Sequence, residues 1–206
     1  MAGIGLYGVY YAKCTLSDGV VTGYEGGTKT LGKAISASFE PTEPDNNPLY
    51  ANNSIAENDS SSGAGGTLTL TLDRLKQEAA VDLYGLTQKT VAVTVDGQSV
   101  SGTGFDYTGN EQSAPVGVAF IKWNQINDNR NNHEVVLYRK VTFGMPTIDA
   151  ETLGETIEWQ TPEITGNVAG KDGDGTEPWY QTYVFPSQDA AIAFIVSVFG
   201  AEAATT

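Results

Sequence analysis

Apolar and polar residues alternate along much of the chain, which predicts β-strands with one buried and one solvated face. In Gly66–Leu72 three leucines alternate with threonines, and in Lys33–Glu40 the apolar positions are Ile35, Ala37 and Phe39. Two-residue periodicity and β-branched or aromatic content predict five further strands, at Lys89–Val95, Val116–Trp123, Val135–Phe143, Glu155–Gln160 and Trp179–Phe185.

Glycine-containing turns and two capped helices interrupt this pattern. The turn signals are Asp18-Gly19, Gly26-Gly27, Asp96-Gly97 and the stretch Gly170–Gly175. One helix is predicted over Arg74–Tyr84, with Asp73 as its N-cap and Gly85 as its stop. The other is predicted over Gln188–Phe199, between the cap Ser187 and Gly200, so a C-terminal helical element occupies 187–200.

The segment Pro41–Gly65 (41–65) separates the first two well-marked strands and is rich in Pro, Asn, Ser, Asp and Gly. Loops of this length are uncommon inside a domain unless they are functional or disordered. Because Leu49, Tyr50 and Ile55 are unusual in a disordered linker, we expect a long inter-strand loop that becomes ordered on a partner.

Composition supports a single mainly-β domain over residues 1–206. Gly, with 24 residues, suits many short strands joined by turns. The net charge of −14 leaves no basic patch with which to neutralise phosphates, so binding to nucleic acid is not expected. The N-terminus has no basic segment followed by a sustained apolar one, and no stretch reaches the ~20 apolar residues of a membrane span. We therefore expect synthesis in a cytoplasm and no membrane partner.

The residues available for catalysis or metal binding are few. His133 is the single histidine, in the polar run Asn124–His133, and is interpreted as a solvated loop residue. Cys14 is the single cysteine and excludes an internal disulfide. The run Asp172-Gly173-Asp174-Gly175 resembles the start of a calcium loop but lacks its later ligands, and is interpreted as a glycine-rich turn. We expect no enzymatic activity, no cofactor and no metal.

Four stretches, taken in order, resemble the phi13-type major tail proteins of long-tailed bacteriophages. The resemblance runs from about Leu31 to Phe199 and leaves the first thirty residues without an assigned role. The stretches are Leu49–Glu57 with the following strand and helix to Leu86, Val116–Lys122 with Val141–Phe143, Gly154–Ile164, and Thr182–Ser187 with its helix.

This resemblance implies a β-sandwich or barrel of the tail tube type with one or two flanking helices. Such subunits form hexameric rings that stack into a tube, and a long loop of each subunit reaches an adjoining ring. The expected partners are further copies of the chain, the tape measure protein, the tail proteins at the tube ends, and double-stranded DNA only in transit through the lumen. The expected location is the tail of the virion.

Two sets of residues are the candidate functional positions. The polar faces of the first two strands are small and non-basic, as suits a wall along which DNA slides; the candidate lumen-facing residues are Ser36, Ser38, Glu40, Thr67, Thr69 and Thr71. The candidate inter-ring loop residues are Leu49, Tyr50, Asn52, Asn53, Ile55 and Glu57.

Two other functions fit the composition. A β-sandwich binding or decoration module on a virion or cell surface would expose aromatic residues in a groove. The three tryptophans, Trp123, Trp159 and Trp179, all lie on predicted strands and are interpreted as core residues. An acidic hydrolase would need a buried carboxylate pair, which the sequence gives no means of choosing among 25 acidic residues.

Overall fold

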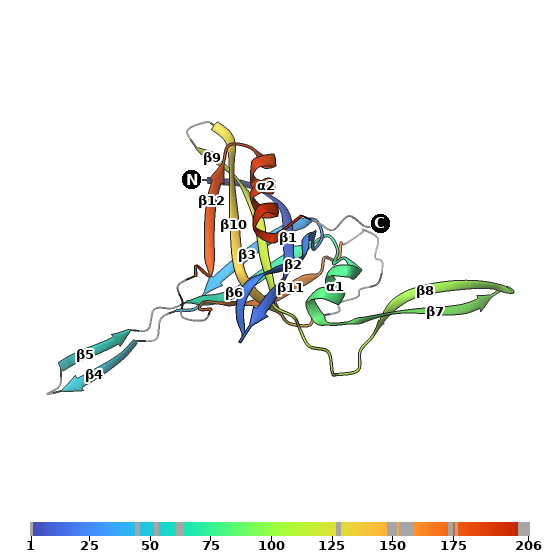
Figure 1. Ribbon diagram of the computed structural model, residues 1–206, viewed down its shortest axis with the longest axis horizontal. Coiled ribbons are helices and arrows are strands. Elements are labelled where there is room, and N and C mark those ends of the chain that lie inside the picture. The colour runs from blue at the N-terminus through green and yellow to red at the C-terminus, as the bar shows by residue number, and fades with distance from the viewer. Residues whose placement is uncertain are drawn as a thin grey trace.

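The computed structural model describes residues 2–43, 46–51, 54–60, 64–126, 129–147, 152, 159–172, 175 and 177–201. Over this part the chain is mainly β with antiparallel sheets and two helices, which confirms the predicted mainly-β class with one or two helices (Figure 1). The strands are β1 (Ala2–Ser17), β2 (Val20–Thr30), β3 (Ala34–Pro41), β4 (Asn46–Ala51), β5 (Ser54–Ser60), β6 (Gly65–Leu72), β7 (Thr87–Val95), β8 (Gln98–Asp106), β9 (Val116–Ile126), β10 (Asn129–Phe143), β11 (Glu163–Ala169) and β12 (Tyr180–Phe185). The helices are α1 (Gln77–Tyr84) and α2 (Gln188–Phe199).

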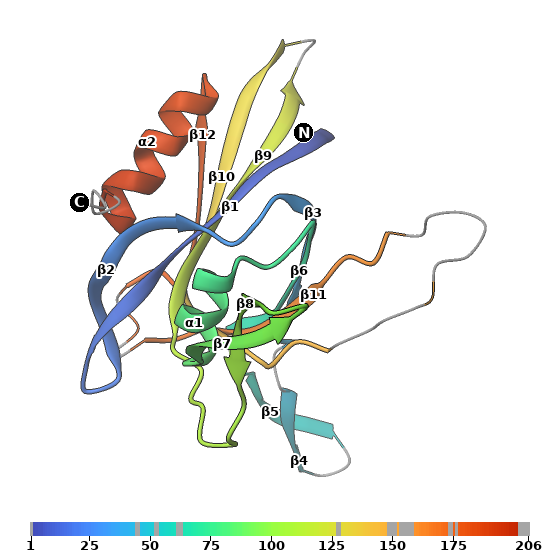
Figure 2. The ribbon, with the colours of Figure 1, turned by 90° about the vertical axis from the view of Figure 1, so that its right-hand side faces the viewer.

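Eight strands form one sheet in the order β2-β1-β9-β10-β11-β6-β3, with β12 also paired to β10. Strand β10 has different neighbours on its two halves. Its His133–Tyr138 portion pairs with β12, and its Val141–Phe143 portion pairs with β11. The sheet therefore divides along β10, and β11, β6 and β3 turn away from the upper part that β9, β10 and β12 form (Figure 2).

The main core lies where this sheet folds over itself. It joins residues of β1, β9 and β10 to the leucines of β6, to Ile164 and Val168 of β11, and to α1. Leu68, Leu70 and Leu72 are fully buried, as their alternation with threonine predicts. A buried leucine side chain contributes roughly 1.5–3 kcal/mol relative to an exposed one, so this leucine row fixes which face of β6 points inward.

Helix α2 covers the opposite face of β9 and β10 and creates a second core. Ala191, Ile195 and Phe199 pack there against Ile121 and Leu137. Consequently Val116–Ile121 is buried on both faces, since alternate residues contact the main core and the helix. The predicted cap is confirmed, because the backbone N–H of Ala190 donates to Ser187 Oγ at 3.2 Å.

The first helix is shorter than predicted. It begins at Gln77, after Lys76, and Asp73 does not cap it. Instead the Asp73 carboxylate accepts the backbone N–H groups of Lys33 (2.7 Å) and Arg74 (2.8 Å), and so ties the start of β3 to the end of β6. Gly85 ends the helix in the left-handed conformation, as predicted.

One expected loop consists largely of strand. Residues Asn124–Ile126 end β9, residues Asn129–His133 begin β10, and the buried Asn124 amide donates to Glu134 Oε2 at 2.6 Å. His133 is therefore not a solvated loop residue: it is 8% exposed and stacks on Trp123 with ring centroids 5.8 Å apart. The polar sequence does not predict a buried strand. Asn124 can be buried there because its amide is hydrogen-bonded to a neighbouring carboxylate.

Residues 2–30 form the long hairpin β1–β2, whose turn is predicted from the sequence but whose two strands are not predicted by the alternation. Asp18 and Gly19 both have positive φ, as a two-residue hairpin turn requires. Gly26 and Gly27, predicted as a turn, lie within β2 with positive φ where the β1–β2 register shifts. Such bulges break two-residue periodicity, which explains why the alternation test misses both strands.

Candidate functional site: a polar sheet face and two projecting hairpins

The six candidate wall residues lie together on one face of β3 and β6. The register pairs Ser36 with Thr71, Ser38 with Thr69 and Glu40 with Thr67. The leucines of β6 point to the other side, into the main core. The Ser36 hydroxyl donates to Thr71 Oγ1 at 2.8 Å, so the polar row is hydrogen-bonded across the strands. The predicted grouping of these six residues on a solvated face therefore agrees with the register and burial.

One apolar residue of β3 departs from the predicted pattern. Ile35 is 53% exposed, whereas Ala37 and Phe39 pack against the core. The register shifts between Ala34 and Ser36, so Ile35 is the extra residue of a bulge. Alternation along the sequence does not predict a bulge. The inserted residue places two consecutive side chains, those of Ile35 and Ser36, on the exposed face.

A third row, from β11, extends the polar face and is missed by the sequence prediction. Its Glu163, Thr165 and Asn167 are exposed and pair with the three threonines of β6. The alternate position Gly166 is buried, and a Cβ there would lie 2.7 Å from Val141 Cγ1 and 2.9 Å from the Phe143 ring. A glycine where an apolar side chain is expected weakens the alternation. Of the strand predicted at Glu155–Gln160, residues 155–158 lie outside the described ones, and residues 159–160 are not in a strand.

The chemistry of this polar face is uniform. Nine positions present hydroxyl groups, one amide and the carboxylates of Glu40 and Glu163, and none is Lys or Arg. The nine residues are Ser36, Ser38, Glu40, Thr67, Thr69, Thr71, Glu163, Thr165 and Asn167. A surface without cations has no means of neutralising phosphates, so it does not retain a polyanion.

The candidate inter-ring segment contains the hairpin β4–β5 and is not a continuous loop. Leu49 pairs with Glu57, Tyr50 with Ile55, and Ala51 with Ser54. Residues Asn52 and Asn53 lie outside the described ones. The hairpin is its own two-stranded sheet and lies apart from the main sheet, at the lower left of Figure 1. Strand pairing satisfies the backbone groups that a loop would leave to water, so the segment is an arm with regular structure.

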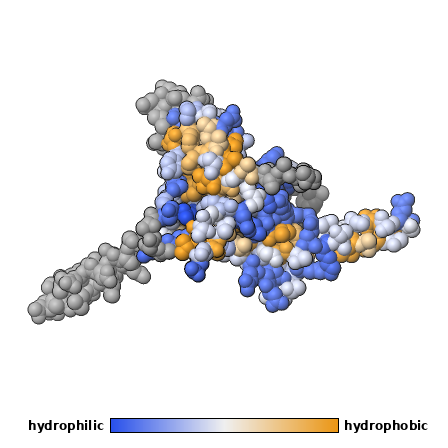
Figure 3. Space-filling model, in the orientation of Figure 1, coloured by the Kyte–Doolittle hydropathy of each residue, from blue (hydrophilic) through white to orange (hydrophobic). Residues whose placement is uncertain are grey.

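A second hairpin, β7–β8, projects on the other side of the molecule. Asp96 and Gly97 form its turn with positive φ, as predicted. All nine residues of β7 are exposed. Strand alternation and the Val93–Val100 pair place four valines on one face of the hairpin, each more than half exposed: Val91, Val93, Val95 and Val100. In Figure 3 hydrophobic residues appear in orange on this hairpin, which projects to the right. We call them the valine row.

The structure corrects the interpretation of two tryptophans. Trp159 is 85% exposed and Trp123 is 44% exposed, so neither is a core residue. Trp179 packs against the core beside Phe39, as expected. Trp123 does not belong to the core that α2 covers, and Trp159 lies outside any described strand.

The lone cysteine is not an activated nucleophile. Cys14 Sγ donates to the carbonyl oxygen of Arg139 at 3.6 Å. Burial raises the pKa of the Cys14 thiol to about 12, against an opposing effect of Lys140. Because the thiolate is the reactive form, this thiol is unreactive at neutral pH.

The carboxylate of Asp172 is bound by the protein's own cations. It lies 3.1 Å from Lys140 Nζ and 3.8 Å from Arg139 Nε, and it accepts the backbone N–H of Val21 at 2.7 Å. Gly175 N–H donates to the Asp172 carbonyl at 3.1 Å, which agrees with the predicted glycine-rich turn. Asp172 thus joins the β1–β2 hairpin to β10 and is not available as a calcium ligand.

Within the described residues no cluster of His, Cys, Asp and Glu could hold a metal ion. Neither described helix is long and apolar enough to cross a lipid bilayer.

A scan against protein-family models finds no match, and a search of curated proteins finds no significant relative.

Proposed function

We propose that this chain is a structural subunit that self-assembles into stacked hexameric rings and forms the tail tube of a long-tailed bacteriophage. The polar face of β3, β6 and β11 carries the proposal. Its nine uncharged or acidic residues would form the inner wall of a conduit through which DNA passes without being held. The hexameric arrangement comes from the sequence resemblance.

The open edges of the sheet supply a means of assembly. Strand β3 ends the sheet path on one side and β2 on the other, and each has a single ladder partner among the described strands. Unpaired edge strands favour pairing with another chain, and closing a ring removes such edges. The polar face lies at the β3 edge, so pairing between subunits there would extend the same face around a lumen.

The projecting hairpins support assembly more than ligand binding. An isolated two-stranded hairpin is only marginally stable in water. The valine row exposes four apolar side chains on such a hairpin, and exposed apolar patches of this kind mark contacts with other proteins. Contacts with neighbouring copies would cover the row and stabilise the hairpin.

A surface binding module is the second candidate, and the exposed Trp159 favours it. Electron microscopy of the purified protein at high concentration separates the two functions. We expect hollow tubes or rings with a central opening. A particle that stays a monomer or a trimer at every concentration, in microscopy and in sedimentation velocity, would contradict the tube and support the module.

The wall assignment has its own test, in infection. A phage carrying Ser36→Lys and Thr69→Lys should assemble normal tails, because both side chains lie on the solvated face. Its DNA ejection should be slowed, since cations on the wall would bind the phosphates. An unchanged infectivity titre would show that this face does not contact DNA.

A further inference from the structure

The β4–β5 arm and a pocket beside the start of β3 lie at opposite ends of the same strand pair. Strands β3 and β6 pair from Ala34–Leu72 at one end to Pro41–Gly66 at the other. The arm is inserted between Pro41 and Gly65, at the second end. Eight residues of strand span roughly 26 Å. An arm at one end and a receptor at the other would give a head-to-tail contact, which generates an open stack and not a closed dimer.

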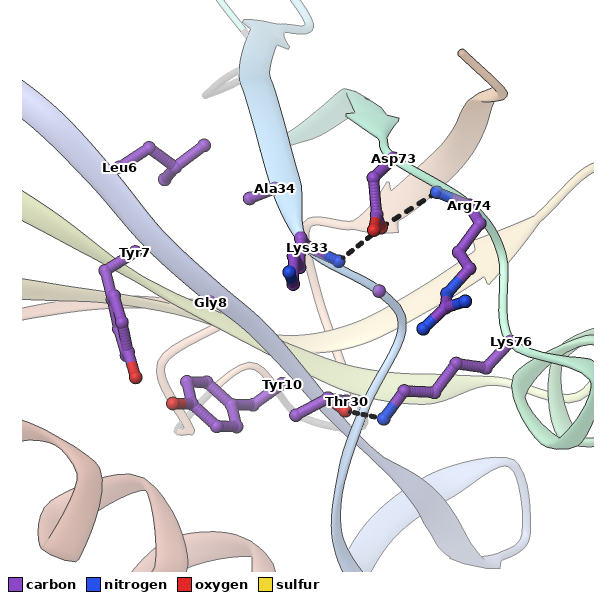
Figure 4. Close-up of a pocket in the computed structure, with 11 residues that line it drawn as sticks. Leu6, Tyr7, Gly8, Tyr10, Thr30, Lys33, Ala34, Asp73, Arg74 and Lys76 are labelled. Carbon is purple, nitrogen blue, oxygen red and sulfur yellow. Dashed lines mark hydrogen bonds between the residues drawn. The ribbon is translucent and has the colours of Figure 1, made fainter.

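The pocket lies at the Ala34 end, between β1, the start of β3 and the segment that follows β6. Its volume is about 460 Å³. Figure 4 shows Leu6, Tyr7 and Tyr10 from β1 along one side and Asp73, Arg74 and Lys76 along the other. The apolar groups of Leu6, Ala34 and the two tyrosines provide contact surface, and a volume of this size accepts a few side chains of a partner.

The pocket is basic in a strongly acidic protein. Lys33, Arg74 and Lys76 belong to its lining, which is three of the eleven basic residues of the chain. Lys76 Nζ donates to Thr30 Oγ1. Among the described residues, the side chains of Lys33 and Arg74 form no ion pair. Asp73 is the one carboxylate of the lining; it accepts two backbone N–H groups and attracts Lys33 and Arg74 without forming an ion pair with either. Two cations are therefore available to an acidic partner.

The arm has the complementary composition. From Pro41 to Gly65 the sequence contains four acidic residues, Glu43, Asp45, Glu57 and Asp59, and no Lys or Arg. The same segment contains Leu49, Tyr50 and Ile55. Most surfaces of two chains with a charge of −14 repel each other, so a contact between copies needs a place where opposite charges meet.

We propose that this pocket is the docking site for the β4–β5 arm of a second copy of the chain, with Lys33 and Arg74 binding acidic residues of the arm. The proposal rests on the proposed tube, and it adds the receptor for the arm. It predicts stacking in which each subunit receives one arm at the Ala34 end of β3 and extends its own arm from the Pro41 end.

Charge reversal tests the proposal. Lys33→Glu with Arg74→Glu should leave the fold unchanged, because Lys33 and Arg74 are both exposed. Each arm would then meet like charges, and the mass of stacked tubes should fall more than about tenfold. Adding Glu57→Lys and Asp59→Lys should restore stacking. Electron microscopy and sedimentation measure the tubes, and circular dichroism with a urea melt checks the fold.

A matched control has the same change in charge away from the pocket. Lys13→Glu with Lys171→Glu should form tubes as the unmodified chain does. If the pocket variant stacks normally, if the control fails equally, or if the arm reversal does not restore stacking, the docking site is wrong. If the unmodified chain forms neither rings nor tubes, the failure lies with the proposed function itself.

Discussion

The strand pairs β9–β10 and β7–β8 contain similar β-branched residues but differ in burial. In β9, Val116–Ile121 is buried on both faces, between the main core and α2. In β7, Val91, Val93 and Val95 are each more than half exposed, and no layer covers them. β-branched content therefore predicts a strand in both places but cannot say what covers it. The subunit itself covers β9, and we propose that neighbouring subunits cover β7.

The largest expected difference between the two regions is in core packing. Ile121→Ala should lower the free energy of unfolding by about 2–5 kcal/mol, because the side chain is fully buried between the sheet and α2. Val93→Ala in the hairpin should change it by less than ~0.5 kcal/mol. Urea denaturation of the two variants gives both values, and equal losses would show that the hairpin is part of the folded core.

The second-largest expected difference between the two regions is in the stability lost on replacing a glycine. A Cβ at Gly117 would lie 2.4 Å from Tyr24 Cε1 and 2.7 Å from Phe199 Cε1. Overpacking of this kind costs about 1–3 kcal/mol, so Gly117→Ala should be clearly destabilised. Gly102→Ala is the matched control, since nothing lies within 4 Å of a Cβ there. If Gly117→Ala leaves the free energy of unfolding unchanged, the rings of Tyr24 and Phe199 do not pack against Gly117 as described.

Removing an ion pair should give a smaller difference in stability between the two regions than the substitutions above. The Asp82 carboxylate accepts the Tyr11 hydroxyl at 2.9 Å and Lys29 Nζ at 2.8 Å. In the hairpin, Lys89 meets Asp106 at 2.5 Å, with both side chains about 60% exposed. Asp82→Asn should cost about 1 kcal/mol of the free energy of unfolding, and Asp106→Asn should cost less, because water screens the exposed pair. A larger loss in the hairpin variant would reverse the comparison.

The stability lost on Asp82→Asn should depend on pH. Burial lowers the pKa of Lys29, but hydrogen bonds to Asp82 and Glu78 outweigh it and raise that pKa above its ordinary value of 10.5. Protonated Lys29 therefore contributes its full stabilisation below pH 10.5 and loses it as the pH rises through the raised value. Denaturation at neutral and strongly alkaline pH should show the gap between Asp82→Asn and the unmodified chain narrowing; a constant gap would contradict this role of Lys29.

The smallest expected effect on the subunit is that of Val93→Ser with Val100→Ser. These side chains pair across the hairpin and are exposed, so the free energy of unfolding should change by less than ~0.5 kcal/mol. Assembly should nevertheless be weakened, because the valine row would no longer bury apolar surface against a neighbour. Sedimentation measures assembly; normal tubes from this variant would show that the row is not at an interface. Thr94→Ser, on the other face of the hairpin, is the control.

Regular alternation and capping make parts of this fold predictable from sequence. The leucines of β6, the cap Ser187 and the turn Asp96-Gly97 each have a local cause, so they can be read without tertiary information. The same alternation predicts the polar face for two of its three strands.

The missed features depend on contacts between distant residues. Strand β11 has Gly166 at an inward position because Val141 and Phe143 occupy the space of a side chain. Asp73 binds the backbone of Lys33, forty residues away, and not a helix N-terminus. The pocket is assembled from three separate segments, so no local sequence motif indicates it.

The most direct measurement is a cryo-electron microscopy reconstruction of the assembled protein in which strands can be traced. We predict a hollow tube whose lumen is lined by the polar face of β3, β6 and β11, with the valine row buried between copies. An assembly with that face on its outer surface, or with basic residues lining its channel, would contradict the conduit.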